Sequence, residues 1–186
     1  MERINEILDN KLYKDETFGT VTRTDIEGNI EFKNVTFKYP NEEKEIFKEF
    51  NIKIPTGKKI AIVGKSGQGK TSIFNLLLRY FDVDSGVILI DDLPIEDFTE
   101  DALRQNIAII RQEPFIFNKT ILENLKIIDP YMSLKKIRNA CKLAEIDDYI
   151  MSLPKKYDTM IGEGGINLSG GQKQRLAIAR ALLKES

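Results

Sequence analysis

The stretch from Gly64 to Thr71 has the residue types and spacing of a phosphate-binding loop, Gly-x-x-x-x-Gly-Lys-Thr. Glycines permit left-handed turns and let the backbone approach a phosphate group closely. The loop follows an apolar run at residues 60–63 and precedes a pattern typical of a helix. Its amides would therefore join the positive end of that helix in one anion cradle. This arrangement predicts a site for a nucleoside triphosphate.

The polar side chains of this loop have separate expected tasks. The Lys70 ammonium would reach the β- and γ-phosphates, and the Thr71 hydroxyl would be a ligand of Mg²⁺. The backbone around the phosphates is expected to come from the remaining loop residues, Gly64, Lys65, Ser66, Gly67, Gln68 and Gly69.

Two further polar residues come directly after apolar runs that predict strands. Gln112 lies just beyond the run at residues 107–110, and ligands gather at the carboxyl ends of strands in open α/β sheets. A glutamine there can bind a metal-bound water or cap the strand. Asp91 ends the run at residues 87–90, as a magnesium-organising aspartate does in proteins with such loops. The alternative for Asp91 is a hairpin turn, since a glycine and a proline flank this region.

Ser169 and Tyr39 are the remaining candidates that the residues themselves suggest. Ser169 and two glycines open a helical pattern, which gives either a second anion-binding helix start or an ordinary capped one. Tyr39 lies at a predicted strand end, where its ring can lie against a base or be half-buried in the sheet.

The elements that must position these residues can be read from periodicity. Alternation at residues 30–39 and 46–54 predicts two antiparallel strands, and the apolar runs at 60–63 and 107–110 predict two buried ones. Residues 4–12 predict an amphipathic helix, either solvated or docked, before a polar linker at 14–24. Further helices are predicted after the phosphate loop, from Thr99 to Arg104, from Ser133 with Cys141 on the apolar stripe, from Asp147 to Leu153, and from Ser169.

Composition excludes several classes of function. Lys and Arg number 28 against 29 Asp and Glu, so no charge excess suggests a nucleic-acid partner. The single cysteine cannot form an internal disulfide and favours a reducing compartment. Histidine, the commonest general base, is absent. No apolar run is long enough to span a membrane, and the first residues do not resemble a signal peptide.

The sequence from Leu168 to Gln172, with residues 173–181 after it, resembles the signature motif of ATP-binding-cassette (ABC) proteins. Together with the phosphate loop this pairing is highly specific, and the resemblance extends from about Ile30 to Leu183. Other matches are to the family's adenine-stacking aromatic at Tyr39-Pro40, to the Gln loop and the segment after it at 111–124, to the exporter X-loop at 159–165, and to the exporter's membrane connection at 3–8. In the X-loop, Met160 and Gly164 replace the usual Glu and Arg.

The resemblance implies a fold and a domain organisation. The expected fold class is α/β, a P-loop NTPase core with an antiparallel β subdomain and an α-helical subdomain, incomplete at the C-terminus. Residues 1–28 would be an N-terminal helix and linker from a membrane domain. Residues 29–186 would be the ATP-binding domain, with its helical subdomain at about 113–168. Asp91 then belongs to a hairpin before the Gln loop.

The resemblance also implies how the site works. MgATP would lie on the phosphate loop, with Tyr39 on adenine, Ser72 near the α-phosphate and Gln112 at the metal or water. A second cassette would pair head to tail, so that the signature residues of one chain meet the γ-phosphate held by the other. Those signature residues are Ser169, Gly170, Gly171 and Gln172.

The implied function is ATP hydrolysis that drives export across a membrane, at its cytoplasmic face and in contact with the transmembrane domain of the same transporter. In the family, the Walker B aspartate, the catalytic glutamate and the switch histidine come later than Ser186. A polypeptide of these residues alone is therefore expected to hydrolyse ATP poorly. The alternatives are a soluble ABC ATPase, against which the X-loop-like stretch argues, and a non-catalytic nucleotide-dependent interaction module.

Overall fold

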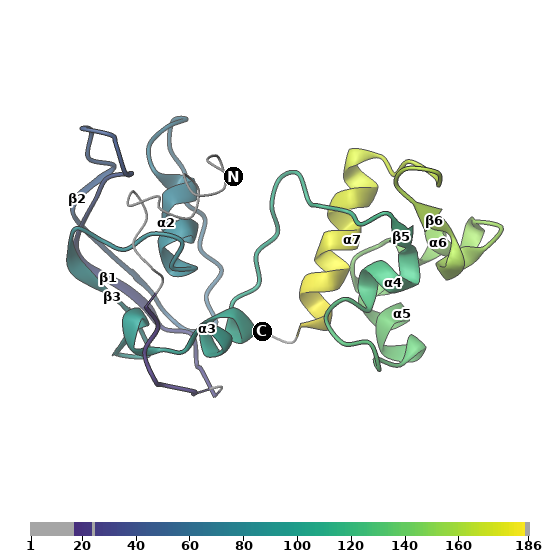
Figure 1. Ribbon diagram of the computed structural model, residues 1–186, viewed down its shortest axis with the longest axis horizontal. Helices are drawn as coiled ribbons and strands as arrows, with labels where there is room; N and C mark the ends of the chain where they lie inside the picture. Colours follow the sequence, from purple (N-terminus) through teal and green to yellow (C-terminus); the bar gives the residue numbers. More distant parts are fainter. Residues whose placement is uncertain (1–16, 24, 185–186) are drawn as a thin grey trace, which may run out of the picture. The chain divides into compact units, whose positions relative to one another are not determined.

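The computed structural model describes residues 17–23 and 25–184 (Figure 1). The chain divides between Asn106 and Ile107 into two compact units. Across the described ranges, every helix is too short or too polar to span a membrane. The helix predicted at residues 4–12 lies outside the described residues.

The first unit is built on an antiparallel sheet of four strands in the order β2-β1-β3-β4. Residues of β1 such as Phe32 and Phe37 are buried, as expected for a strand with one face on the core. Ile30 pairs with Ile54 on one side and with Ile90 on the other. Both strands predicted from alternation are confirmed. The bounds are β1 Ile30–Phe37, β2 Phe47–Ile54, β3 Ser85–Ile90 and β4 Leu93–Pro94.

Two helices of this unit match the sequence predictions. Helix α2 (Lys70–Leu77) comes after the phosphate loop and lies alongside the sheet (Figure 1), with Ile73 and Leu76 buried. Helix α3 (Glu100–Asn106) begins after Thr99, whose hydroxyl accepts a hydrogen bond from the amide of Ala102 at 3.2 Å. A short 3₁₀ helix, η1 (Ile95–Asp97), precedes it.

The two buried strands predicted at residues 60–63 and 107–110 are wrong. Neither segment has regular secondary structure, and most of their apolar side chains are exposed: Val63 is 89% and Ile110 is 46% exposed, while Ile62 and Ile107 are half-buried. A strand in a parallel sheet is held by ladder hydrogen bonds to its neighbours. Among the described residues no segment pairs with either run. The apolar side chains of both runs favour burial, and the described part of the chain buries them only in part.

Asp91 lies in the β3–β4 turn, which confirms the hairpin interpretation. Its carboxylate accepts hydrogen bonds from the amides of Glu27 at 2.7 Å, Gly28 at 3.1 Å and Asn29 at 2.8 Å. The backbone of Asn29 in turn accepts from the Asp91 amide at 2.9 Å. The aspartate therefore fixes the chain that enters β1 to the end of β3.

Replacing Asp91 with asparagine should release the backbone at Glu27, Gly28 and Asn29. Asparagine tolerates the left-handed backbone of Asp91 (φ 50), so the change removes the charge and replaces one of the two acceptor oxygens with an amide group, without backbone strain. Hydrogen–deuterium exchange is expected to speed up at these amides, by at least about tenfold where the hydrogen bond is lost and by less where the remaining oxygen still accepts, because a hydrogen bond to a charged group is stronger than one to a neutral group. The matched control is Asp92→Asn, because Asp92 is the exposed neighbour and also has a positive φ, of 64°. Unchanged exchange in Asp91→Asn would contradict the assignment.

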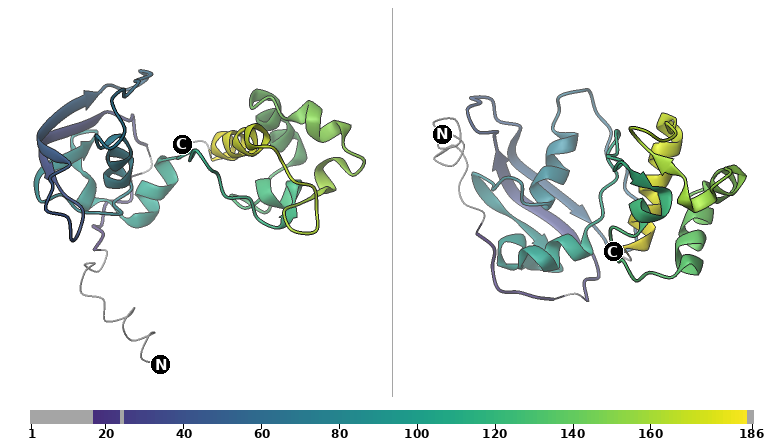
Figure 2. Two further views of the ribbon diagram at one scale, coloured as in Figure 1. Left: turned by 90° about the horizontal axis from the view of Figure 1, so that it is seen from above. Right: turned by 45° about the vertical axis from the view of Figure 1, so that its right-hand side comes forward.

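The second unit is helical with one two-stranded sheet. Its longest helix, α7, packs against α5 and α4 (Figure 2). Ile137 and Leu176 are fully buried in its core, and Cys141 is buried with them. The helices predicted from Ser133, Asp147 and Ser169 are confirmed. The bounds are α4 Ile121–Leu125, α5 Leu134–Leu143, α6 Asp147–Ser152, η2 Lys156–Asp158 and α7 Gly170–Leu183, with β5 Lys119–Thr120 and β6 Met160–Ile161.

Candidate functional site

The loop at residues 64–69 has a backbone that requires glycine at two positions. Gly67 and Gly69 have φ of 79° and 82°, in the left-handed region. At Gly69 a Cβ would also come within 2.7 Å of Ile46 and 2.8 Å of Phe47, so the loop is packed against the chain entering β2. The loop therefore has the left-handed turns that a phosphate cradle needs.

Lys70 lies across the opening of this loop. Its ammonium donates hydrogen bonds to the carbonyl oxygens of Gly64 at 2.8 Å and Lys65 at 2.6 Å. The amide of Lys65 donates to the side-chain oxygen of Gln68 at 2.9 Å. These bonds keep the loop closed around the lysine. A triphosphate arriving here would meet a positive charge already held at the first turn of α2.

Tyr39 lies beside the same helix. Its hydroxyl shares a hydrogen bond with that of Ser72 at 2.8 Å and accepts one from the Asn75 amide group at 3.1 Å. The half-buried ring meets Phe37 and Phe81 edge to face, each at 5.0 Å between centroids. The structure thus brings Tyr39 together with Ser72, both predicted site residues. The roles of Tyr39 at adenine and Ser72 at the α-phosphate stay predictions.

Ser169 begins α7 with a reciprocal pair of capping bonds. Its hydroxyl accepts from the amide of Gln172 at 3.3 Å, and the Gln172 side chain accepts from the amide of Ser169 at 2.8 Å. Ser169, Gly170 and Gly171 are exposed. The ordinary cap is therefore present, and it leaves an accessible helix start whose dipole favours an anion.

Gln112 lies in the same unit as the start of α7. Its carbonyl oxygen accepts a hydrogen bond from the side chain of Gln174 at 3.2 Å, and the residue is exposed. A strand end was expected at Gln112, and the structure has an irregular loop instead. Its contact with a metal or water stays a prediction.

Two polar residues that sequence reasoning missed fix the chain after Gln112. Asn124, fully buried, exchanges hydrogen bonds with the backbone of Phe117 at 3.0 and 2.9 Å. Arg180 of α7 donates to the carbonyl oxygens of Asn124 at 2.9 Å and Phe115 at 2.7 Å, and also to the Asn124 side chain. Burial lowers the pKa of Arg180. The segment after the predicted Gln loop is therefore attached to the helix that Ser169 begins.

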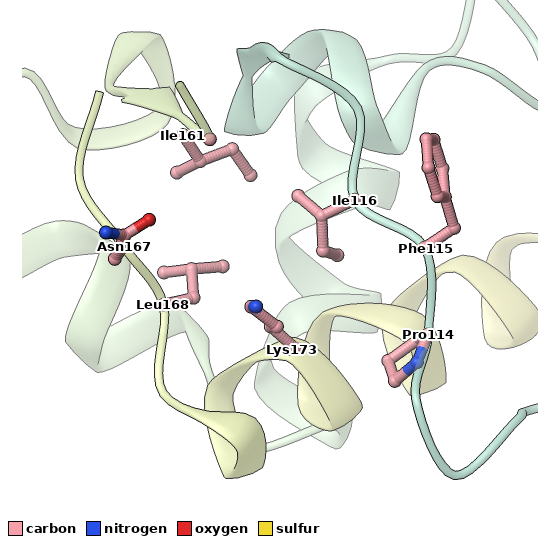
Figure 3. Close-up of a pocket in the computed structure, with 8 residues that line it drawn as sticks. Pro114, Phe115, Ile116, Ile161, Asn167, Leu168 and Lys173 are labelled. Atoms are coloured by element: carbon pink, nitrogen blue, oxygen red, sulfur yellow. The ribbon is translucent and has the colours of Figure 1, made fainter. Parts of the chain in front are cut away.

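A pocket of about 270 Å³ opens beside this attachment. Figure 3 shows Ile116, Ile161 and Leu168 lying around it, with the Lys173 side chain entering from α7. Its lining is therefore mixed, with Ile116, Ile161 and Leu168 beside the polar Asn167 and the cationic Lys173. Such a surface suits an apolar side chain with an acidic neighbour better than a nucleotide base.

A buried ionic group holds α5, α6 and η2 together. Asp147 is 3% exposed and accepts two hydrogen bonds from Arg138, at 3.1 and 2.9 Å, and one from the Tyr157 hydroxyl at 2.6 Å. The Arg138 guanidinium, helped by the Tyr157 bond, holds the pKa of Asp147 below its usual range against the effect of burial. Burial raises the pKa of the neighbouring Cys141 thiol to about 11, so this cysteine is a protonated core residue.

Comparison with known proteins covers nearly the whole chain. A sequence model described as "ABC transporter" matches residues 47–186. ABC transporter B family member 2 of Dictyostelium discoideum is 40% identical over 98% of this chain and 13% of its own length. A putative multidrug export ATP-binding/permease protein of Bacillus subtilis is 39% identical over 99% of this chain and 32% of its own length. The ATP-dependent lipid A-core flippase of Escherichia coli is 41% identical over 97% of this chain and 31% of its own length. The chain thus spans 13% to 32% of the length of these relatives.

Proposed function

Because this chain belongs to the ABC transporter family, we propose that its loop at residues 64–71 binds ATP with Mg²⁺. The observation that carries the proposal is the loop geometry: two left-handed glycines and the Lys70 ammonium held by two loop carbonyls at the start of α2. The matched family region includes this loop, which supports a nucleotide-binding role for it. Adenine would lie near Tyr39.

The residues present fit a magnesium ion. Mg²⁺ prefers oxygen ligands and keeps waters and substrate phosphates among them. Thr71 offers an exposed hydroxyl in the first turn of α2, next to Lys70, as one such oxygen ligand. Gln112 belongs to the second unit, and its role at the metal stays a prediction. When bound, the ion neutralises phosphate charge. Lys70 would hold the phosphate oxygens in place, and the loop amides would complete their hydrogen bonds.

ATP hydrolysis is the activity of the family, and in a complete transporter it would drive export of a substrate across a membrane. For a polypeptide of these residues alone we propose little turnover. Its sequence contains no histidine, which is the commonest general base. Loss of a general base typically costs about 10²- to 10⁴-fold in rate.

Two partners fit the surfaces of the second unit. The exposed start of α7 at Ser169 would face the γ-phosphate bound by a second cassette in a head-to-tail pair. The pocket around Ile116 and Leu168 would take part in contact with a transmembrane domain. The multidrug exporter and the flippase have names that refer to export or lipid movement, which supports a position at the cytoplasmic face of a membrane.

Equilibrium dialysis of the full chain with labelled ATP tests the nucleotide site. ATP is expected to bind more tightly with Mg²⁺ than with a chelator. AMP should bind at least about tenfold more weakly than ATP, because it lacks the phosphates that Lys70 would contact. The matched control is inorganic triphosphate, which should compete with ATP since the loop holds phosphates. Equal affinity for ATP and AMP would overturn the proposal.

A further inference from the structure

Arg79 has an environment that its place at the end of α2 does not explain. Its backbone is left-handed, with φ of 53°, and its side chain is only 7% exposed. The guanidinium donates to the carbonyl oxygen of Thr17 at 2.9 Å and to the Asp82 carboxylate at 3.0 Å. It also lies over the ring of Phe18 at 4.9 Å. One buried guanidinium therefore contacts a carbonyl, a carboxylate and an aromatic ring. The planar guanidinium, with its several donors, suits such multiple contacts.

Thr17 and Phe18 belong to a segment, residues 17–21, whose backbone is hydrogen-bonded to residues 97–99. We call this arrangement the seating of the segment. The amide of Gly19 donates to the carbonyl of Phe98 at 3.0 Å, and the amide of Val21 donates to that of Asp97 at 2.8 Å. The carbonyl of Val21 accepts from the amide of Thr99 at 2.9 Å. A Cβ at Gly19 would come within 2.2 Å of the Asp97 carbonyl oxygen. The 17–21 segment therefore lies directly against the backbone before α3, with no room for a larger residue at Gly19.

Helix α2 connects this seated segment to the phosphate loop. Lys70 begins the helix, and Arg79 lies just past its end, so the two basic residues mark opposite ends of one rigid element roughly 12 Å long. A change in the placement of α2 when phosphates bind at Lys70 must therefore alter the position of Arg79. The same holds in reverse, because coupling between two sites is reciprocal.

We propose that Arg79 is a positioning residue that couples the seating of the 17–21 segment to nucleotide binding. The seated segment holds the far end of α2, and α2 then presents the loop amides and Lys70 in the geometry that phosphates require. The inference rests on the proposed nucleotide site. The inference goes beyond that site, because it predicts that a segment roughly fifty residues earlier in the chain contributes to the affinity for ATP.

Hydrogen exchange and ATP titration of the full chain test this coupling together. In the wild-type chain, saturating MgATP is expected to slow exchange at the Gly19 and Val21 amides about fivefold. Arg79→Gln and Gly19→Ala should each weaken ATP affinity by about fivefold, and Arg79→Lys should fall between them and the wild type. The control is Arg104→Gln, an exposed arginine on α3 paired with Glu100, which should leave ATP affinity unchanged.

The outcomes separate the two proposals. No ATP binding by the wild-type chain overturns the nucleotide site itself. ATP binding with unaltered exchange at Gly19 and Val21 overturns the coupling, even if the variants are less stable, because a merely structural arginine does not respond to nucleotide. Gly19→Ala changes no charged group, so it decides the affinity question if Arg79→Gln does not fold.

Discussion

Lys70→Ala is expected to weaken ATP binding by about 10- to 100-fold, the range that corresponds to losing one hydrogen bond to a charged partner. The lysine contributes in two ways. Its ammonium would contact the β- and γ-phosphates, and it already holds the carbonyl oxygens of Gly64 and Lys65 together. Fluorescence titration of the full chain with an ATP analogue measures the change.

The matched control for Lys70 is Lys58→Ala. Lys58 is exposed and precedes the loop, so its removal changes net charge equally without touching the cradle. Its affinity should stay within about twofold of the wild type, because exposed charges act weakly at physiological salt. If both variants lose affinity equally, the lysine acts through general charge and the proposed phosphate contact is wrong.

The second large effect is expected on stability, from Asp147→Ala. Breaking a buried ion pair costs about 3–5 kcal/mol and an exposed pair about 0–1. Asp147 is 3% exposed while Arg138 is 37% exposed, so solvent partly screens this pair. The variant also leaves the Tyr157 hydroxyl without its acceptor. We expect a loss of about 2 kcal/mol in the free energy of unfolding, measured by urea denaturation.

Asp148→Ala is the control for that experiment, since Asp148 is exposed in the same first turn of α6. Its cost should not exceed about 1 kcal/mol, the usual value for a carboxylate near a helix start. Equal effects from the two aspartates would contradict the role assigned to Asp147.

The same carboxylate predicts a pH dependence. The folded-state pKa of Asp147 lies below its unfolded value, chiefly because Arg138 donates to the ionised form. Its stabilisation is therefore complete above the unfolded pKa of about 3.9 and is lost as pH falls through the folded pKa. Lys142 also favours the charged form. Asp147→Asn should flatten the fall in stability at acid pH, and an unchanged acid limb would contradict the assignment.

Secondary-structure elements that depend on residues close together in the sequence were predicted correctly. The caps at Thr99 and Ser169, the helix start at Ser133 and the alternation in β1 each involve residues a few positions apart. The glycine turns of the loop at residues 64–69 also follow from local spacing, and phosphate binding by this loop stays a prediction.

Contacts between distant residues could not be predicted in that way. Tyr39 and Ser72 are separated by 33 positions, and Arg180 and Asn124 by 56. Arg180 was missed because an arginine in a basic helix gives no sign that it is half-buried against two backbone carbonyls. The strands expected at residues 60–63 and 107–110 failed for a related reason. An apolar run records a tendency to be buried, whereas a strand needs a partner from elsewhere in the chain.

Those two runs have a consequence for how the polypeptide behaves at high concentration. Short β-branched stretches that are exposed and lack a ladder partner are templates for pairing between molecules. Residues 60–63 are flanked by Lys58 and Lys59 before them and Lys65 after, and residues 107–110 have Arg111 directly after them. Flanking charges of this kind oppose stacking of neighbouring copies. The basic residues beside residues 60–63 are therefore expected to oppose aggregation, independently of any role in nucleotide binding.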